Sequence, residues 1–294
     1  MRLSKPKAFF LSLIFPIAYL LIQLGVSGTA AGFAALAAGF ASLGDPQAAG
    51  EMLTEFAGSS VLILSGISSA ITIAAVYLWL VGSKKNVAAE LNLKRIDPLS
   101  LILALVLGVA ANFAVSGLLS LLPIPEGMMN QYSETVGEML AGGSPWQSVL
   151  FVGILGPVAE EYAFRGMCMG TLRKGFKALT ALIVAAVVFA LAHLVPLQMA
   201  YVLPVAFLLG FVFLWTDSLY GTLAMHIAFN LTSSVMGILS DGGEEALEAS
   251  GFSWEMLLIS LAGLLVSAAC LYGIWRRRRA SVSDLPPATE SAGE

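Results

Sequence analysis

Long runs of apolar residues recur along the whole chain, and each comes close to the length that a bilayer requires. A helix needs about 20 predominantly apolar residues to cross the hydrocarbon core. Eight such stretches span residues 8–30, 60–82, 99–122, 147–171, 177–195, 198–215, 219–240 and 255–275. The strict alternation of apolar and polar residues that marks the strands of a membrane β-barrel does not occur in them. The pattern predicts an all-α fold, a polytopic membrane helix bundle with about eight transmembrane helices.

The composition agrees with this prediction. Of the 294 residues, 58% are hydrophobic and only 12% are charged, whereas about 25% of the residues of a soluble domain are charged. The fifth and sixth apolar stretches are short, and the sequence LVPLQ between them (residues 194–198) predicts a tight hairpin. The chain therefore has the composition of a membrane protein rather than of a soluble domain.

The basic residues are sorted to one side of the predicted topology. With a cytoplasmic N-terminus, 14 of the 15 Lys and Arg residues fall in cytoplasmic segments, as the positive-inside rule requires. They are Arg2, Lys5, Lys7, Lys84, Lys85, Lys94, Arg95, Arg173, Lys174, Lys177 and Arg276 to Arg279. The opposite loops carry acidic residues instead, for example Asp45, Glu134 and Glu245. Because a miscounted helix would mix the two sets, the charges favour eight crossings with both termini in the cytoplasm.

The two ends of the chain differ in composition from its middle. The first apolar run has a basic start but no convincing cleavage site, so we interpret it as a retained helix rather than a removed signal. We divide the chain into helices 1–3 with their loops (1–146), core helices 4–7 (147–240), the last helix with its basic RRRR anchor (241–279), and a polar tail (280–294). The tail is rich in Pro and Ser and is predicted to be disordered.

Strongly polar side chains interrupt the apolar runs in the second half of the chain. They are Glu160, Glu161, Arg165, His193, His226 and Asn230, and the two histidines are the only ones in the sequence. An ionisable group at the bilayer centre costs about 2.5–3.5 kcal/mol. A lone histidine often makes a helix–helix hydrogen bond, and a lone Glu–Arg pair can be a structural clamp. The occurrence of all these residues together favours a functional site.

Helix geometry predicts different partners for the two glutamates. Glu161 and Arg165 are four residues apart, share one helix face and are expected to neutralise each other. Glu160 is rotated by about 100° from Glu161 and therefore faces something else. Gly156-Pro157 just upstream is expected to break the helix. Glu160 would then lie in a first turn, where free N–H groups favour a carboxylate.

Glu160, His193 and His226 come from three predicted helices and can converge inside a bundle. Two imidazoles and a carboxylate form a three-ligand site for a zinc-like divalent metal, with an open position for water. They equally form a metal-free hydrolytic site, in which Glu160 activates water and His226 with Asn230 stabilises the developing oxyanion. Both alternatives stay open, with a slight preference for metal because imidazoles facing a carboxylate are good ligands for a divalent ion.

The depths of these residues do not match in a bundle of straight helices. Glu160 and His193 lie about 18–27 Å above the cytoplasmic turn at 172–177, counted at 1.5 Å per residue. His226 lies only about 10–13 Å above its own turn on the same scale. Helix tilt or a break at Pro157 is needed to close this gap, and the site is expected near the middle of the membrane.

The same residues form three motifs that carry a resemblance to a known family. EEYAFR (160–165) fits EExxxR, FALAH (189–193) fits FxxxH and HIAFN (226–230) fits HxxxN. In these motifs the chain resembles the CPBP family of intramembrane proteases. That family includes the type II CAAX prenyl endopeptidases and the bacterial bacteriocin-processing and self-immunity proteins. The resemblance covers roughly residues 147–240.

The resemblance implies an intramembrane endopeptidase of the CAAX type or of the bacteriocin and immunity type. The implied roles are Glu160 as general base for water, Glu161 with Arg165 as its support, His193 and His226 as metal ligands or oxyanion stabilisers, and Asn230 as oxyanion partner. Expected partners are a membrane-protein or lipidated-peptide substrate and the lipid bilayer, with no nucleic acid. The expected location is the cytoplasmic membrane of a prokaryote.

Two other classes of function compete with a protease. An ion-coupled transporter also carries Glu, His and Arg within its helices. It often shows broken helices in two related halves, whereas the polar residues here gather in one half. A non-enzymatic scaffold or immunity protein would keep the polar cluster for stability alone. A Glu160→Gln change distinguishes these classes, because a scaffold tolerates it and a protease does not.

Overall fold

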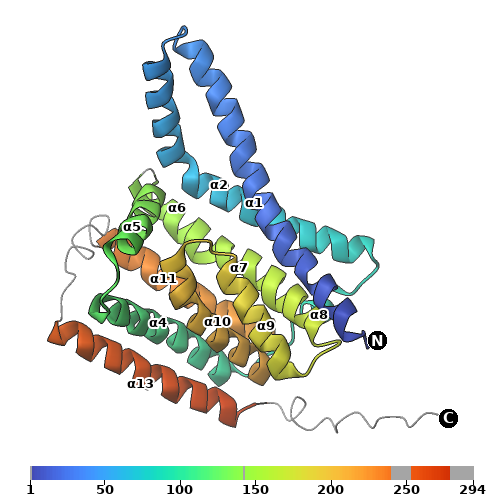
Figure 1. Ribbon diagram of the computed structural model, residues 1–294. Helices are drawn as coiled ribbons and strands as arrows, with labels where there is room; N and C mark the ends of the chain where they lie inside the picture. The colour runs from blue at the N-terminus through green and yellow to red at the C-terminus, as the bar shows by residue number, and fades with distance from the viewer. Residues whose placement is uncertain (1, 142, 240–252, 279–294) are drawn as a thin grey trace.

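The computed structural model describes residues 2–141, 143–239 and 253–278, and Figure 1 shows a helix bundle from which a long helical hairpin projects. Within these ranges the chain is helical apart from short connections, and it contains no strand. The elements are α1 (Lys5–Ala41), α2 (Pro46–Gly82), α3 (Val87–Glu90), α4 (Pro98–Leu121), α5 (Glu126–Ala141), α6 (Pro145–Gln147), the π-helix η1 (Ser148–Leu155), α7 (Gly156–Glu160), the π-helix η2 (Glu161–Met169), α8 (Gly170–Leu172), α9 (Ala178–Leu191), α10 (Pro196–Thr216), α11 (Leu219–Leu239) and α13 (Trp254–Arg276). The predicted disordered tail lies outside the described residues.

Each of the eight predicted segments is largely helical in its described part. Six helices, α1, α2, α4, α10, α11 and α13, are long and apolar enough to cross a membrane. Of the other two, α9 has only 14 residues, and residues 145–172 form one run of α-helical and π-helical turns. The protein is therefore an integral membrane protein with an all-α, polytopic fold. The count of eight crossings stays a prediction.

Helices α1 and α2 extend far into the segment that we predicted as a loop. Each has 37 residues, or about 55 Å at 1.5 Å per residue, compared with about 30 Å for the hydrocarbon core. The Asp45 carboxylate caps α2 by accepting a hydrogen bond from the N–H of Gln47 at 3.0 Å. The sequence prediction ended these helices too early, because it followed apolar runs and stopped at the polar residues near the tip of the α1–α2 hairpin. The same prediction missed α5, which lies in the predicted loop between 123 and 146.

The predicted helix break at Gly156-Pro157 does not occur. Leu155 and Gly156 keep right-handed helical dihedral angles, with φ −68° and ψ −39°, and φ −55° and ψ −60°. The N–H of Gly156 bonds to the carbonyl oxygen of Phe151, five residues back, in the π-helical pattern. Pro157 has no N–H to offer, and the wider turns on either side accommodate it without interrupting the helix.

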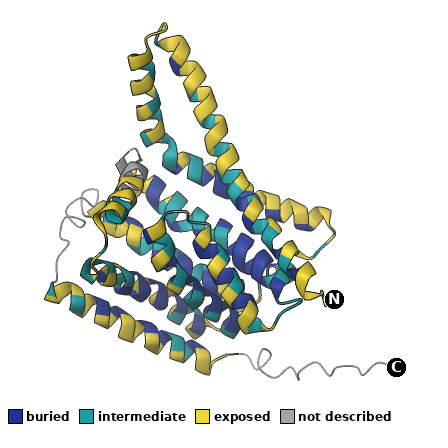
Figure 2. Ribbon diagram, viewed as in Figure 1, coloured by how far each residue is buried: buried dark blue, intermediate teal, exposed yellow. Residues whose placement is uncertain are grey.

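Small residues bring the helices of the bundle into close contact. A Cβ at Gly108 of α4 would lie 2.2 Å from the carbonyl oxygen of Met225 on α11. A Cβ at Gly263 of α13 would lie 2.7 Å from the carbonyl oxygen of Ala110 on α4. Lipid provides little hydrophobic drive for helices to associate, so close backbone contact supplies much of the packing energy. Figure 2 shows buried residues inside the bundle and exposed residues along α13 and the α1–α2 hairpin.

Four of the basic segments meet at one end of the bundle. The N–H of Leu3 bonds to the carbonyl oxygen of Lys174 at 2.9 Å, and the Lys174 ammonium pairs with Glu90 at 2.9 Å. Arg277, after α13, pairs with Asp97 at 3.5 Å. The hydrogen bond from Lys174 holds the pKa of the Glu90 carboxyl below its ordinary value. The two termini of the described chain, the 83–98 segment and the 172–177 turn therefore share one end of the bundle.

Asp217, in the turn between α10 and α11, joins this end to the helices that carry the candidate site. Its backbone is left-handed, with φ 47°, and its carboxylate pairs with Lys94. It also accepts a hydrogen bond from Asn92 at 3.1 Å and lies 3.8 Å from the Arg173 guanidinium. Because Arg173 directly follows the 145–172 run and Asp217 precedes α11, these contacts hold the two helices at a constant offset along their axes.

Candidate active site

Glu161 lies at the centre of the polar cluster, at the first residue of η2. Its Oε1 accepts a hydrogen bond from Nη1 of Arg165 at 3.0 Å and lies 2.8 Å from Nδ1 of His226 on α11. The three residues are only 0%, 2% and 5% exposed. The ion pair expected from the four-residue spacing forms, and His226 joins it as a third member.

Glu160 faces in another direction, as the helix geometry predicted. Its Oε1 accepts a hydrogen bond from the hydroxyl of Tyr19 on α1 at 3.0 Å, and its Oε2 lies 3.5 Å from Nε2 of His226. Its side chain is 16% exposed, compared with 0% for Glu161. The His226 imidazole therefore lies between the two carboxylates. A carboxylate only accepts hydrogen bonds, so Nδ1 of His226 carries a proton toward Glu161.

Phe189 links the two histidines to this cluster. The Arg165 guanidinium lies over its ring, with Cζ 4.1 Å from the ring centroid. Edge-to-face contacts place the centroids of the His193 and His226 rings 4.9 Å and 5.9 Å from that of Phe189. Phe189 itself is 2% exposed. The Phe189 ring therefore lies against both imidazoles and keeps them apart.

His193 lies beyond the end of its helix rather than within it. We predicted a helix over 177–195, but α9 ends at Leu191 and His193 belongs to the turn before α10. Its Nδ1 bonds to the carbonyl oxygen of Phe189 at 2.9 Å, at the free C-terminal end of α9. Leu194 adopts a positive φ of 61°, which turns the chain toward Pro196. As Nδ1 is used in the cap, only Nε2 of His193 is available to other groups.

Asn230 is bound to the backbone of the neighbouring helix. Its Nδ2 donates a hydrogen bond to the carbonyl oxygen of Val152 in η1 at 3.0 Å. In the π-helical pattern that carbonyl would accept from residue 157, and Pro157 has no N–H. Asn230 therefore satisfies a carbonyl group that the proline leaves free. It lies on the same face of α11 as His226, four residues further along the helix.

The mismatch in depth between His226 and the glutamates disappears in the structure. A π-helix has more residues per turn than an α-helix and rises less per residue, so the π-helix η2 brings Glu160 nearer to the turn at 172–177 than we calculated. The contacts of Asp217 also hold the start of α11 against that turn. His226 reaches both carboxylates without a helix break at Pro157.

With this geometry in place, a family comparison adds to the resemblance given by the motifs. The family model described as type II CAAX prenyl endopeptidase Rce1-like matches residues 142–232. The match supports the resemblance of this segment to the CPBP family of intramembrane proteases. The match covers less than half of the chain, but it contains all six candidate site residues. No curated protein and no solved structure matches the chain.

We call residues 142–232 the Rce1-like segment. Its match to the family model supports an intramembrane endopeptidase of the CAAX type that acts on membrane proteins. It includes the helical run that carries Glu160, Glu161 and Arg165, together with α9, α10 and most of α11. It does not include α1, α2, α4 or α13. The family match therefore says nothing about what these four helices contribute to the protein.

The donor atoms of the Rce1-like segment suit a metal in type but not in placement. Nδ1 of each histidine is directed to a protein acceptor, which leaves Nε2 available, as in many metal-ligating histidines. However, the described residues contain no group of three or more His, Cys, Asp or Glu side chains placed to hold a metal ion. Glu160, His193 and His226 are thus not gathered into a coordination set. We derive no step through a metal.

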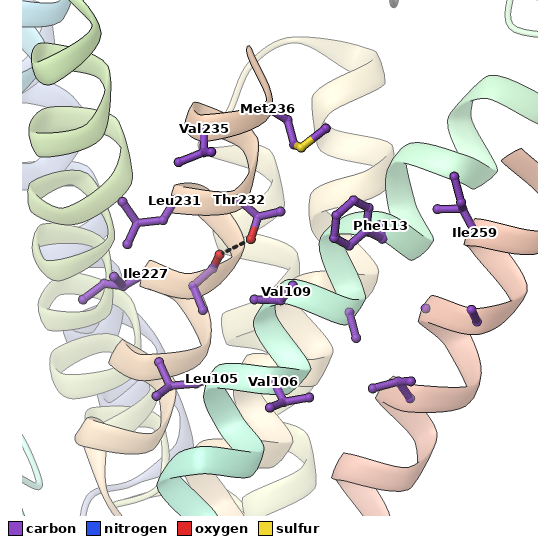
Figure 3. A pocket seen from close by; sticks show the side chains of 15 residues that line it. Leu105, Val106, Val109, Phe113, Ile227, Leu231, Thr232, Val235, Met236 and Ile259 are labelled. Carbon is purple, nitrogen blue, oxygen red and sulfur yellow. Dashed lines mark hydrogen bonds between the residues drawn. The ribbon is translucent and has the colours of Figure 1, made fainter. Parts of the chain in front are cut away.

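A large apolar cavity lies on the other side of α11. It lies between α4, α11 and α13 (Figure 3). Its volume is about 960 Å³. Ile227 and Leu231 line it, although they directly follow His226 and Asn230 in sequence. The hydroxyl of Thr232, which also lines it, donates to the carbonyl oxygen of Ala228 at 2.7 Å. The cavity contains none of the candidate site residues and offers no chemistry of its own.

Sequence reasoning missed one residue of the polar cluster, Tyr19. It lies in the first apolar run, outside the Rce1-like segment, and no motif marks it. The only available signal was a tyrosine in the middle of an apolar helix, since a buried tyrosine hydroxyl usually has a hydrogen-bond partner. That signal shows that a partner exists, but not that the partner is Glu160.

Proposed function

We propose that the protein is an intramembrane endopeptidase in which Glu160 activates the attacking water. The observation that supports this most directly is the position of the His226 imidazole, with Nδ1 2.8 Å from Glu161 Oε1 and Nε2 3.5 Å from Glu160 Oε2. Glu161 is enclosed and paired with Arg165, whereas Glu160 is partly exposed. Hydrolytic enzymes often combine a reactive group, an imidazole and a buried acid that orients the imidazole.

The charges of the cluster balance when His226 carries a proton on both ring nitrogens. Two carboxylates, Glu160 and Glu161, then face two cations, Arg165 and His226. A neutral imidazole that donates from Nδ1 to Glu161 would direct the lone pair of Nε2 at the Glu160 carboxylate. Because uncompensated charge is costly within a membrane, the balanced form is the resting state that we propose.

In the proposed reaction Glu160 removes a proton from water as the water oxygen attacks the carbonyl carbon of the scissile bond. The negative charge that develops on the carbonyl oxygen is stabilised by Nε2–H of His226. The proton held by Glu160 then passes to the leaving nitrogen as the C–N bond breaks. Water has then supplied a hydroxyl group to the new acid and a proton to the new amine, and Glu160 is again a carboxylate.

The remaining residues of the cluster support this reaction. Arg165 and Glu161 hold His226 in place through its Nδ1. Nε2 of His193 is available to bind water or the substrate, because Nδ1 is used in the cap of α9. Asn230 donates one amide hydrogen to Val152 and has a second for the substrate carbonyl oxygen.

The Rce1-like segment favours a CAAX-type substrate, in which a lipidated cysteine lies near the C-terminus of a membrane-bound protein. A bacteriocin-processing or immunity-related substrate would use the same chemistry. The test uses an internally quenched peptide that ends in farnesyl-cysteine, two aliphatic residues and one further residue. The purified protein in lipid vesicles should cleave this peptide.

Glu160→Gln should lower kcat for this peptide by about 100-fold or more, because general-base catalysis contributes about 10² to 10⁴. Glu55→Gln is the matched control, since Glu55 is an exposed acid on α2 and should leave kcat unchanged. Full activity of Glu160→Gln would contradict the proposal. Comparison of membrane proteomes from wild-type and Glu160→Gln cells would identify the natural substrate. If Glu160→Gln cells show the phenotype of cells that lack the protein, but their membrane proteome contains the same peptides as the wild type, the result would favour a transporter.

Metal assistance has a separate test. If water is activated by Glu160 alone, the purified protein should hold no stoichiometric metal and should keep its kcat after treatment with a chelator. If a zinc-like ion takes part, chelation should abolish activity, and His193→Ala and His226→Ala should both lower the metal content. The placement of the donor atoms favours the first outcome. Elemental analysis alongside activity distinguishes the two.

A further inference from the structure

We infer that Tyr19, on a helix outside the Rce1-like segment, positions the proposed base Glu160. The inference rests on the proposed function of Glu160. The Tyr19 hydroxyl donates a hydrogen bond to Glu160 Oε1 at 3.0 Å, across 141 residues of sequence. The bond connects α1 directly to the helical run that carries both glutamates. A helix that belongs to no matched family thereby contributes to the site.

Tyr19 is held in its orientation by the groups around it. The residue is 6% exposed, and its ring meets that of Phe164 edge to face, with centroids 5.6 Å apart. Phe164 in turn packs against Phe189 at 4.9 Å, the ring that separates the two histidines. The hydroxyl is therefore directed at Glu160 by a continuous set of aromatic contacts rather than by a flexible side chain.

The register of α1 against the Glu160 helix is also held at a second point. The N–H of Leu3 bonds to the carbonyl oxygen of Lys174 at 2.9 Å. A Cβ at Gly175 would lie 2.5 Å from Cβ of Ala8, which shows how closely the start of α1 approaches this turn. With contacts at both the turn and Glu160, α1 cannot slide along the neighbouring helix without breaking one of them.

The hydrogen bond determines which oxygen of Glu160 is available for reaction. Tyr19 occupies Oε1, and Oε2 faces Nε2 of His226 at 3.5 Å. A glutamate side chain has several rotatable bonds, and a fixed donor at one oxygen limits the rotamers that it adopts. A base held in the reactive geometry gains rate, because less freedom is lost in the transition state. Tyr19 acts through Glu160 and is therefore a positioning residue.

The first experiment is the Tyr19→Phe change, which removes the hydroxyl and keeps the ring. With the quenched farnesylated peptide we expect kcat to fall by about 10- to 100-fold, as for the loss of a hydrogen bond to a charged group. KM should stay within about twofold, because the substrate itself is not contacted. The thermal unfolding temperature should fall by only a few degrees, far less than for a variant that leaves a buried charge unpaired. Tyr162→Phe, which removes a hydroxyl from the Glu160 helix two residues further on, is the matched control and should keep kcat.

A kcat within about twofold of the wild type in Tyr19→Phe would overturn the inference. So would a loss of kcat accompanied by an equal loss of folded protein, since that result describes a purely structural residue. Neither result would affect the role of Glu160, which the Glu160→Gln variant tests separately.

The second experiment detects the contact without any measurement of activity. The carboxyl ¹³C resonance of Glu160 in Glu-labelled protein is assigned by its disappearance in Glu160→Gln. We expect this resonance to shift in Tyr19→Phe and to stay in place in Tyr162→Phe. An unchanged resonance in Tyr19→Phe would overturn the inference even if the protease activity is established. A shifted resonance in a protein without protease activity would instead overturn the proposed function and leave the contact standing.

Discussion

At the scale of single residues, two neighbouring glutamates have different surroundings because a helix turns about 100° between them. Glu161 is enclosed, with one oxygen shared by Arg165 and His226, while its Oε2 is buried without a hydrogen-bond partner. Glu160 is partly exposed, and its Oε1 accepts a hydrogen bond from the Tyr19 hydroxyl. The first arrangement serves to balance charge, and the second leaves a carboxylate oxygen free for chemistry.

This difference predicts different effects of removing each charge. Glu161→Gln or Arg165→Leu leaves the other member of a buried ion pair without its partner, at a cost of about 3–5 kcal/mol. Both variants should therefore give less folded protein and a lower unfolding temperature in detergent. Glu160→Gln is the isosteric comparison and should fold like the wild type, because its side chain is partly exposed and still accepts a hydrogen bond from Tyr19. Equal stability of all three variants would contradict this division of roles.

At the scale of helices, close packing depends on positions where no side chain is present. Gly108 lets α4 approach the backbone of α11 within two residues of His226, and Gly263 lets α13 approach α4. The glycines in the projecting part of the α1–α2 hairpin, residues 25–58, are different, since a Cβ at Gly28 or at Gly50 would meet nothing within 4 Å. The same residue type therefore has a packing role in the bundle and none in the projecting part of the hairpin.

A pair of Gly→Ala variants tests this distinction. Gly108→Ala places a Cβ against the backbone carbonyl of Met225, which cannot move aside without shifting α11. We expect a loss of about 1–3 kcal/mol, as for overpacked cores, and a lower kcat because α11 carries His226. Gly28→Ala should be neutral or slightly stabilising, since alanine favours the helix more than glycine does. Thermal unfolding in the same detergent measures the stability of both variants. If Gly108→Ala and Gly28→Ala lose the same amount of stability, the tight contact at Gly108 is unimportant.

At the scale of the whole molecule, charge and packing agree on one end of the bundle. The N-terminal segment, the 83–98 segment, the 172–177 turn and the end of α13 are joined there by ion pairs and backbone hydrogen bonds. Basic residues next to membrane helices remain on the cytoplasmic side. The α1–α2 tip and α5 lie away from this end (Figure 1).

We therefore expect Ser83 and Glu134 to lie on opposite sides of the membrane. Both positions are exposed, so single cysteines introduced there should be labelled by a maleimide that does not cross the bilayer. In intact cells Glu134→Cys should be labelled and Ser83→Cys should be labelled only after the membrane is opened. The native cysteines are buried and serve as the unlabelled background. Labelling of both variants from outside would refute the topology.

The sequence by itself determined that the eight apolar segments are largely helical, and it singled out most of the candidate site residues. Backbone hydrogen bonds in lipid must be made within each segment, so a long apolar run becomes a helix whatever surrounds it. Because polar groups are costly in lipid, the six polar residues of the second half of the chain stood out as candidates. The Glu161–Arg165 pair followed from the spacing of four residues alone.

Only the tertiary structure decided which groups meet. That His226 lies between Glu160 and Glu161, that Asn230 bonds to Val152, and that Tyr19 reaches Glu160 all depend on the positions at which separate helices cross. The π-helical turns around Pro157 and the early end of α9 before His193 depend on contacts with other segments too. Local periodicity contains no information about such contacts, because a hydrogen bond across 141 residues leaves no trace in the spacing of either partner.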